Sequence, residues 1–179
     1  MHFSTAFLAA AFLLSGANAL NCTQRLSNGV LSVWKTGINF GTKINLDVDP
    51  NTFEVVTTTG GQQSVTLTAC DANTIVFPGA GEIVTTKGRL ETIGGCLGRN
   101  STTGAVRSTP CSADDQAALD QGQLWQFSLV FHPDGEMTGS DREIVPFKKG
   151  TFTHIAAGKL ELATTQGPST FFLTFDFVE

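Results

Sequence analysis

The stretch GRLETIGGCLGRNSTTGAVRSTPCSADDQAALDQGQLWQF, residues 88–127, decides the expected fold. It contains, in order, the motifs G-x-L, C-L, P-C and Q-x-W-x-F. Alternate residues of a strand point to the same side, so Gln123, Trp125 and Phe127 of the last motif share one face. An indole and a phenyl ring on one face suit the core of an all-β barrel. We therefore interpret Trp125 and Phe127 as core residues and Gln123 as a structural amide that bonds to local backbone.

The same order of motifs recurs, with substitutions, on both sides of this stretch. The first third repeats it in four segments, residues 29–31, 45–48, 65–70 and 73–77. The last third keeps only an opening at residues 134–137 and a phenylalanine-rich strand at 171–177. Self-similarity of this kind indicates three degenerate units, with residues 65–70 as the third strand of the first unit and 73–77 as its closing strand.

Short runs of β-favouring residues make up most of the chain, separated by Gly, Asn, Asp and Pro. This pattern is typical of an all-β sandwich or barrel. The runs are residues 30–34, 43–48, 52–59, 64–69, 74–77, 82–86, 124–131, 151–155, 159–163 and 170–178. One short helix is expected over residues 112–119, where Ser112 and Asp115 match a capping box.

These motifs resemble those of the ricin B-chain type β-trefoil lectins, which include related xylan- and galactose-binding modules with the Q-x-W signature. The resemblance is good over residues 88–127, moderate over 29–77 and weak over 134–178. It implies an all-β fold, namely a single-domain β-trefoil of three degenerate repeats. It also implies an extracellular, lectin-like protein whose partners are glycans or glycoproteins.

Four cysteines, Cys22, Cys70, Cys96 and Cys111, form an even set. Two disulfides are expected in an oxidising compartment, and counting alone allows three pairings. The resemblance implies one of them, with Cys96 bonded to Cys111 inside the second unit and Cys22 bonded to Cys70. Because there is no C-x-x-C spacing, the sequence predicts no metal site. No cofactor is expected either.

The resemblance further implies where a saccharide would bind in each unit. The family holds the sugar with the acid of C-L-D-V, the aromatic residue of V-x-L-aromatic-x-C and the amide just before Q-x-W. In the first unit these places fall on Asp47, Thr68 and Asn73, which are our candidate carbohydrate-binding residues. The acid is kept, whereas threonine replaces the stacking aromatic.

The other two units have lost more of the sugar-binding pattern. The second unit has Gly98, Thr109 and Gly122 at the three places. The third unit does not align closely enough to assign them; Phe152 or His154 could stack on a ring or belong to the core. The chain has no tyrosine and only two tryptophans, and Trp34 is interpreted as either core or an unorthodox platform. We therefore expect sugar binding that is weak or altered, from partly eroded sites.

The first nineteen residues indicate export. A short apolar run is followed by Ala17-Asn18-Ala19, a pattern that signal peptidase accepts, so residues 1–19 are predicted to be a signal peptide and 20–179 the mature domain. The protein is then secreted, and the sequons at Asn21 and Asn100 are candidate glycosylation sites. We expect a monomer.

Charge and motif content exclude several function classes. The formal net charge is −5 and no basic stripe is present, so neither nucleic acid nor an anionic membrane is an expected partner. No G-x-S-x-G occurs, and the carboxylate pairs fit solvated loops, so we do not expect an enzyme. The alternative is a secreted β-trefoil protease inhibitor acting through the 98–110 loop, with Arg99 or Arg107 entering a trypsin-like pocket. A glycan on Asn100 would obstruct Arg99.

Overall fold

The computed structural model describes residues 19–35, 42–70, 83–130, 143–165 and 171–177. These ranges form twelve strands and one short helix. The strands are β1 (Gln24–Lys35), β2 (Thr42–Val48), β3 (Val55–Thr58), β4 (Val65–Ala69), β5 (Ile83–Thr92), β6 (Gly95–Arg99), β7 (Val106–Thr109), β8 (Trp125–Val130), β9 (Glu143–Pro146), β10 (Phe152–Ala156), β11 (Lys159–Ala163) and β12 (Phe171–Phe177), and the helix is α1 (Asp115–Asp120).

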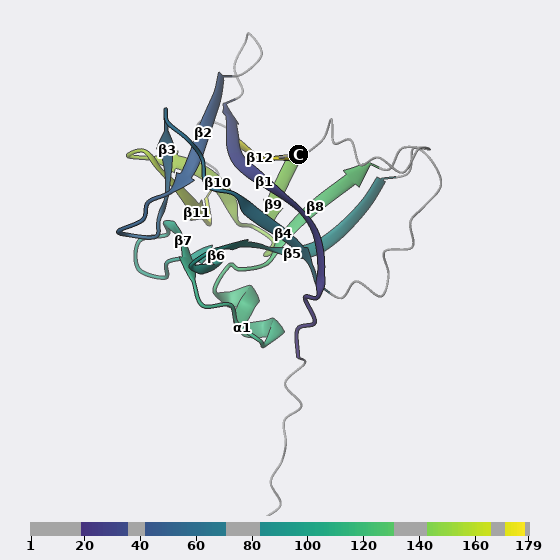
Figure 1. Ribbon diagram of the computed structural model, residues 1–179. Helices are drawn as coiled ribbons and strands as arrows, with labels where there is room; N and C mark the ends of the chain where they lie inside the picture. The colour runs from purple at the N-terminus through teal and green to yellow at the C-terminus, as the bar shows by residue number, and fades with distance from the viewer. Residues whose placement is uncertain (1–18, 36–41, 71–82, 131–142, 166–170, 178–179) are drawn as a thin grey trace, which may run out of the picture.

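Six strands close into a barrel (Figure 1). Each is paired antiparallel with two neighbours, in the order β1–β4–β5–β8–β9–β12 and back to β1. Closure leaves none of these six strands with an unpaired edge. The expected all-β class is therefore confirmed.

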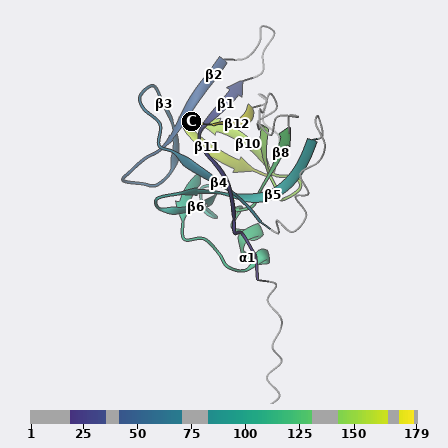
Figure 2. The same ribbon diagram turned by 45° about the vertical axis from the view of Figure 1, so that its right-hand side comes forward.

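The other six strands form the hairpins β2–β3, β6–β7 and β10–β11. Figures 1 and 2 show these hairpins gathered on one side of the barrel, while β5 and β8 reach away on the other side. The hairpins contact one another in a cycle of three antiparallel bridges. The bridges are Glu54↔Arg107, Ala105↔Glu161 and Lys159↔Val56.

A main-chain hydrogen bond accompanies each contact between hairpins. The carbonyls of Phe53, Gly104 and Gly158 accept from the N–H groups of Ser108, Leu162 and Thr57, at 2.8, 2.9 and 2.8 Å respectively. All three accepting residues have a positive φ, of 59° at Phe53, 81° at Gly104 and 77° at Gly158. The three hairpins therefore repeat one backbone geometry, with phenylalanine in one hairpin where the other two have glycine.

The core also repeats three times around the barrel. Cross-strand pairs of buried apolar residues recur at corresponding positions, Leu31↔Phe175, Leu67↔Leu90 and Phe127↔Ile144. Burying one such side chain stabilises the fold by roughly 1.5–3 kcal/mol. Trp125 is fully buried, and its Nε1 donates to the carbonyl of Leu97 at 3.1 Å. Trp125 and Phe127 thus lie in the core, as expected from their shared strand face.

The disulfides join Cys22 to Cys70 and Cys96 to Cys111, which is the pairing that the resemblance implied. Cys70 belongs to a second, smaller apolar cluster with Ala118 of α1 and Leu124. The mature N-terminus expected at Leu20 packs against this cluster.

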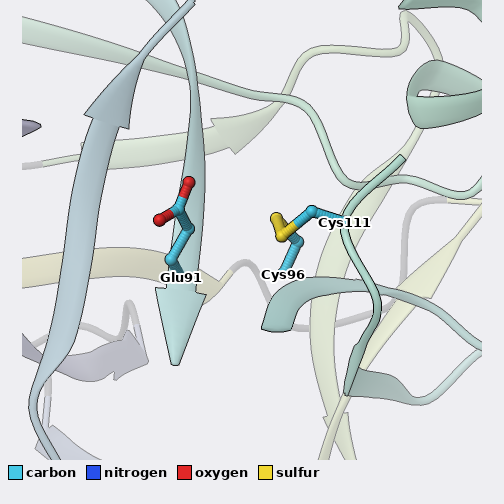
Figure 3. A group of neighbouring side chains, drawn as sticks. All are labelled: Glu91, Cys96 and Cys111. Carbon is cyan, nitrogen blue, oxygen red and sulfur yellow. A yellow bond between two sulfur atoms is a disulfide. The ribbon is translucent and has the colours of Figure 1, made fainter. Parts of the chain in front are cut away.

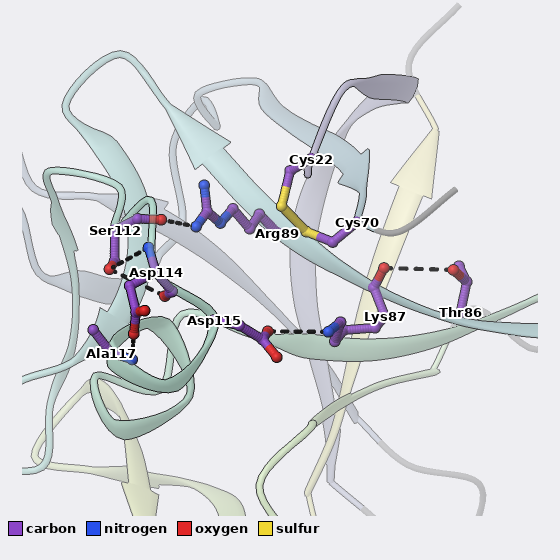
Figure 4. Close-up of polar contacts among 9 residues, drawn as sticks. All are labelled: Cys22, Cys70, Thr86, Lys87, Arg89, Ser112, Asp114, Asp115 and Ala117. Carbon is purple, nitrogen blue, oxygen red and sulfur yellow. Dashed lines mark hydrogen bonds and ion pairs between the residues drawn. A yellow bond between two sulfur atoms is a disulfide. The ribbon is translucent and has the colours of Figure 1, made fainter. Parts of the chain in front are cut away.

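The helix differs in its start from the expected capping box. Its N-cap is Asp114, whose side chain accepts from the N–H of Ala117 at 2.7 Å. Ser112 instead accepts from the N–H of Asp114, because it lies two residues before the N-cap. An ion pair of 3.0 Å between Lys87 and Asp115 ties this end of α1 to β5 (Figure 4).

One strand assignment differs from the sequence expectation. Residues 65–69 were expected to be the third strand of the first unit, but β4 pairs with β1 and β5 in the barrel, and β3 is the strand that pairs with β2. The opening expected for the third unit at 134–137 and the closing strand expected at 73–77 lie outside the described residues. No helix in the described ranges is long and apolar enough to cross a membrane.

Candidate functional site

Asp47 is held at a polar corner on the outside of the first hairpin. Its neighbours in β2, Leu46 and Val48, point into the core, so strand alternation turns Asp47 outward. Its Oδ1 accepts from the N–H of Gln63 at 2.9 Å and from that of Val48 at 2.8 Å. The Gln63 amide in turn donates to the carbonyl of Val48 at 3.2 Å. These bonds fix the carboxylate beside the start of β4.

Gln63 also lines a surface depression between the first and second units, which we call the Gln63 depression. Its walls come from β1, β4 and the β5–β6 turn, and are formed by Arg25, Asn28, Gln63, Ser64, Thr66, Glu91, Thr92 and Ile93. Asn28 Oδ1 accepts from the Thr66 hydroxyl at 2.9 Å and from the Arg25 guanidinium at 2.5 Å. Ile93 is fully exposed at the rim. The lining thus combines amides, hydroxyls and charges with one apolar side chain.

Phe53 lies on the other side of the same turn. A Cβ built on Gly94 would be 3.3 Å from Cδ1 of Phe53, so the ring lies against the residue next to Ile93. The ring is nevertheless 44% exposed. Phe53 and the Gln63 depression therefore both border the β5–β6 turn, and Asp47 is joined to the depression through the hydrogen bond from Gln63.

Charged side chains hold the backbone before and after Phe53. Asp49 accepts from the N–H groups of Asn51 and Thr52, both at 2.8 Å, and these bonds lower the pKa of its carboxyl. Glu54 pairs with Lys159 at 2.6 Å, and its carboxylate raises the pKa of that ammonium group. The backbone around Phe53 is thus held by side-chain bonds on both sides.

Two of the three expected sugar ligands, Asp47 and Thr68, lie apart in the structure. Thr68 is buried in β4, opposite Arg25 and Arg89. Because β2 and β4 pair with different halves of β1, Thr68 and Asp47 lie apart. Asn73 lies outside the described residues.

The strand register relates positions in the first hairpin to positions in the second. Thr58 stands opposite Asn45 in the first hairpin as Thr109 stands opposite Cys96 in the second, so Thr58 occupies the place we gave to Thr68. Sequence reasoning missed Gln63 and Phe53. The Q-x-V-x-L pattern of residues 63–67 was a usable signal, because it matches Q-x-W-x-F once both are recognised as closing strands.

The second hairpin has no room for a side chain at Gly98, where the resemblance would place the acid. A Cβ placed on Gly98 would lie 2.7 Å from the Gln121 carbonyl oxygen and 2.8 Å from Cγ of Gln123. Gln123 is fully buried; its oxygen accepts from the N–H of Ser112 at 2.8 Å, and its Nε2 donates to Thr109 and Pro110 at 3.0 and 2.9 Å. The structural role expected for Gln123 therefore also closes the second site.

The surface of the second hairpin carries two arginines, whereas that of the first carries Asp47. A depression there is lined by Arg99, Asn100, Ser101, Arg107, Thr109, Pro110 and Gln121. Among the described residues, neither guanidinium forms an ion pair with a carboxylate. The Nε of Arg99 donates to the carbonyl of Leu162 at 2.9 Å, and the Nε of Arg107 is buried without a partner.

The two arginines bear on the inhibitor hypothesis. Arg107 lies inside β7, with Gly98 opposite on one side and Glu54 bridged on the other. Arg99 ends β6, just before a turn closed by a 2.8 Å bond from the N–H of Asn100 to Ala105. A protease needs a free, extended segment to pair with, and Arg107 has both neighbouring positions occupied. The geometry offers this hypothesis no specific support.

The remaining aromatic and titratable candidates are scattered. Trp34 and Phe152 are each 38% exposed, on β1 and β10. His154 faces Glu161 across its own hairpin at 3.2 Å. Neither aromatic residue lines the Gln63 depression.

Two further polar side chains of β5 are the half-buried Glu91 and the buried Arg89. Glu91 lies near the sulfurs of Cys96 and Cys111, but both sulfurs are in the disulfide, so no thiolate is available for a metal (Figure 3). Arg89 is buried on β5 and donates to the carbonyl of Ser112 (Figure 4), and burial lowers the pKa of its guanidinium.

Comparison of the chain with protein-family models, curated proteins and solved structures finds no match.

Proposed function

We propose that this protein is a secreted, lectin-like carbohydrate-binding protein with a β-trefoil architecture of three degenerate repeats. The architecture is supported by the cycle of three hairpins and by the recurring apolar pairs in the barrel. In this interpretation β1–β4, β5–β8 and β9–β12 are the three repeats. The cycle of like contacts argues against an ordinary sandwich, whose two sheets carry no three-fold repeat.

The Asp47–Gln63 corner, opening beside a depression lined by amides and hydroxyls, is the observation on which the carbohydrate proposal rests. Sugars present vicinal hydroxyls that both donate and accept. A carboxylate with one oxygen fixed by backbone N–H groups, next to amides, suits such a pattern. The partners are then glycans or glycoproteins, bound with low affinity because the site is open to solvent.

Export is supported by two disulfides, which form and persist in oxidising compartments. The proposed glycosylation sites are also accessible. Asn21 is exposed, and Asn100 begins a turn whose Ser101 and Thr102 are exposed. Mass spectrometry of the secreted protein, before and after enzymatic deglycosylation, tests both sequons and the cleavage after Ala19.

A glycan array followed by calorimetric titration tests the carbohydrate proposal. We expect the wild-type chain to bind a subset of neutral saccharides, and Asp47→Ala to abolish that binding. Asp47→Asn keeps an acceptor for the Gln63 N–H, so it separates loss of charge from loss of structure. Asp120→Ala, an exposed acid that pairs with Lys148 away from the depression, is the matched control and should bind as wild type. Strong binding that survives Asp47→Ala would contradict the proposed site.

A further inference from the structure

Phe53 occupies a backbone position that its two counterparts give to glycine. In each hairpin this residue has a positive φ, and its carbonyl accepts a hydrogen bond from a main-chain N–H of the next hairpin. Only glycine adopts that conformation without steric cost, and a bulky side chain there is an outlier. Gly104 and Gly158 make the same contact without a side chain, so the fold requires none at this position. The phenylalanine is therefore not needed to build the hairpin.

Core packing does not explain the residue either. The Phe53 ring is 44% exposed and lies against Gly94 and Ser108 at the molecular surface. The buried residue of β3 is Val55, which is fully buried, as are its counterparts Val106 and Leu160. Strained positions that persist in folded proteins cluster at functional sites.

The surroundings of the ring point to a ligand with one apolar and one polar side. Past Gly94 the surface continues to the fully exposed Ile93 and then into the Gln63 depression. A pyranose ring presents a C–H face that packs on aromatic rings, and a rim of hydroxyls that needs donors and acceptors. Thr92, Glu91 and Gln63 offer such groups on the far side of the turn.

We propose that Phe53 is the stacking platform of the saccharide site, replacing the aromatic residue absent from β3. The C–H face of a pyranose packs on the Phe53 ring and Ile93, and its hydroxyls reach the Gln63 depression. This inference rests on the proposed carbohydrate-binding function and extends it to a residue outside the family's sugar-binding pattern.

Substitutions at Phe53 separate stacking from structure. Phe53→Asn keeps a side chain that tolerates a positive φ, and Phe53→Gly reproduces the other two hairpins. Both should weaken saccharide binding about tenfold or more, the loss expected for one stacking contact. Both should leave the melting temperature unchanged or raised. Phe53→Trp should retain binding, and Phe152→Ala, an equally exposed aromatic elsewhere, should bind as wild type.

The saccharide probe is the strongest wild-type ligand from the array, titrated by calorimetry alongside thermal melts. If Phe53→Asn binds as wild type, Phe53 is not the platform, and the proposed function stands without it. A clear fall in melting temperature for both Phe53→Asn and Phe53→Gly would instead assign the ring to packing and overturn the inference. If the wild-type chain binds no saccharide, both proposals fail.

Discussion

The first and second hairpins share a backbone but present opposite surfaces. Val48 stands opposite Val55 in one as Arg99 stands opposite Val106 in the other, and both third strands bury a valine completely. Outside this frame the first hairpin presents Asp47 and a phenyl ring, whereas the second presents two guanidinium groups. The two hairpins thus share their main-chain pairing and the buried valine of the third strand. Their outward side chains are free to diverge.

Corresponding main-chain carbonyls in the two hairpins are also paired with different side chains. The carbonyl of Leu97 accepts from the Trp125 indole, and that of Leu46, at the corresponding place, accepts from the Gln62 amide at 2.9 Å. A buried carbonyl must be paired, but any donor that reaches it will do. The first unit therefore keeps the architecture without a Q-x-W motif.

The largest expected effect comes from placing an aspartate at Gly98 of the second hairpin, the position that corresponds to Asp47 of the first. Gly98→Asp forces a side chain into the Gln121 carbonyl and the Gln123 stem, and should destabilise the protein by about 3 kcal/mol or more. Urea unfolding measures this. The control is Gly60→Asp, where a Cβ meets only Thr58 Oγ1 at 3.6 Å. Equal stability of the two variants would show that the second site is not closed by packing.

Replacing the two corresponding glutamines should also have unequal effects on stability. Gln123→Ala should destabilise the protein more than Gln63→Ala does. Gln123→Ala leaves the Ser112 N–H and the Pro110 carbonyl without their buried partner, at a cost of about 2–3 kcal/mol. Gln63 is exposed, so Gln63→Ala should cost less than about 1 kcal/mol while reducing saccharide binding. Urea unfolding of the two variants measures this difference. If Gln63→Ala destabilised the protein more than Gln123→Ala, Gln63 would be the structural glutamine of the two.

A third, smaller effect on stability is expected at Gly104, the counterpart of Phe53 in the second hairpin. Gly104→Ala places a Cβ at φ +81° with only the Leu162 carbonyl nearby, at 3.4 Å, so backbone strain alone should cost about 1 kcal/mol. Gly61→Ala, in open space without a positive φ, is the control. If Gly104→Ala were stabilising, the conformation shared by Phe53 would not be strained.

The smallest effect is the pH dependence that Asp49 gives to the first hairpin. Backbone N–H groups of Thr52 and Asn51 lower the pKa of Asp49, so its ionised form stabilises the turn. That contribution is complete above the unfolded-state pKa of about 3.9 and is lost as the pH falls through the lower folded-state pKa. Amide chemical shifts of Asn51 and Thr52 should titrate with a midpoint below 3.9. Asp49→Asn should abolish this titration, and a midpoint above 3.9 would contradict the assignment.

Sequence patterns identified only part of the proposed site, and the reason is register. Asp47 was singled out because it lies within a recognisable strand motif, N-L-D-V. Thr68 was assigned to a third strand because the period-two pattern of residues 65–69 fits a third or a closing strand equally well. Gln63 and Phe53 belong to connections whose neighbours, such as Gly94, are distant in sequence.

By itself the sequence determined the all-β class, the even cysteine set and the burial of Trp125 and Phe127, because strand alternation and turn residues are local properties. It determined none of the spatial neighbours of Asp47. Only the tertiary structure decided that Gly98 has no room for a side chain and that Phe53 adopts a glycine conformation beside Gly94. Both facts depend on atoms brought together by the cycle of hairpins, and no local pattern records such contacts.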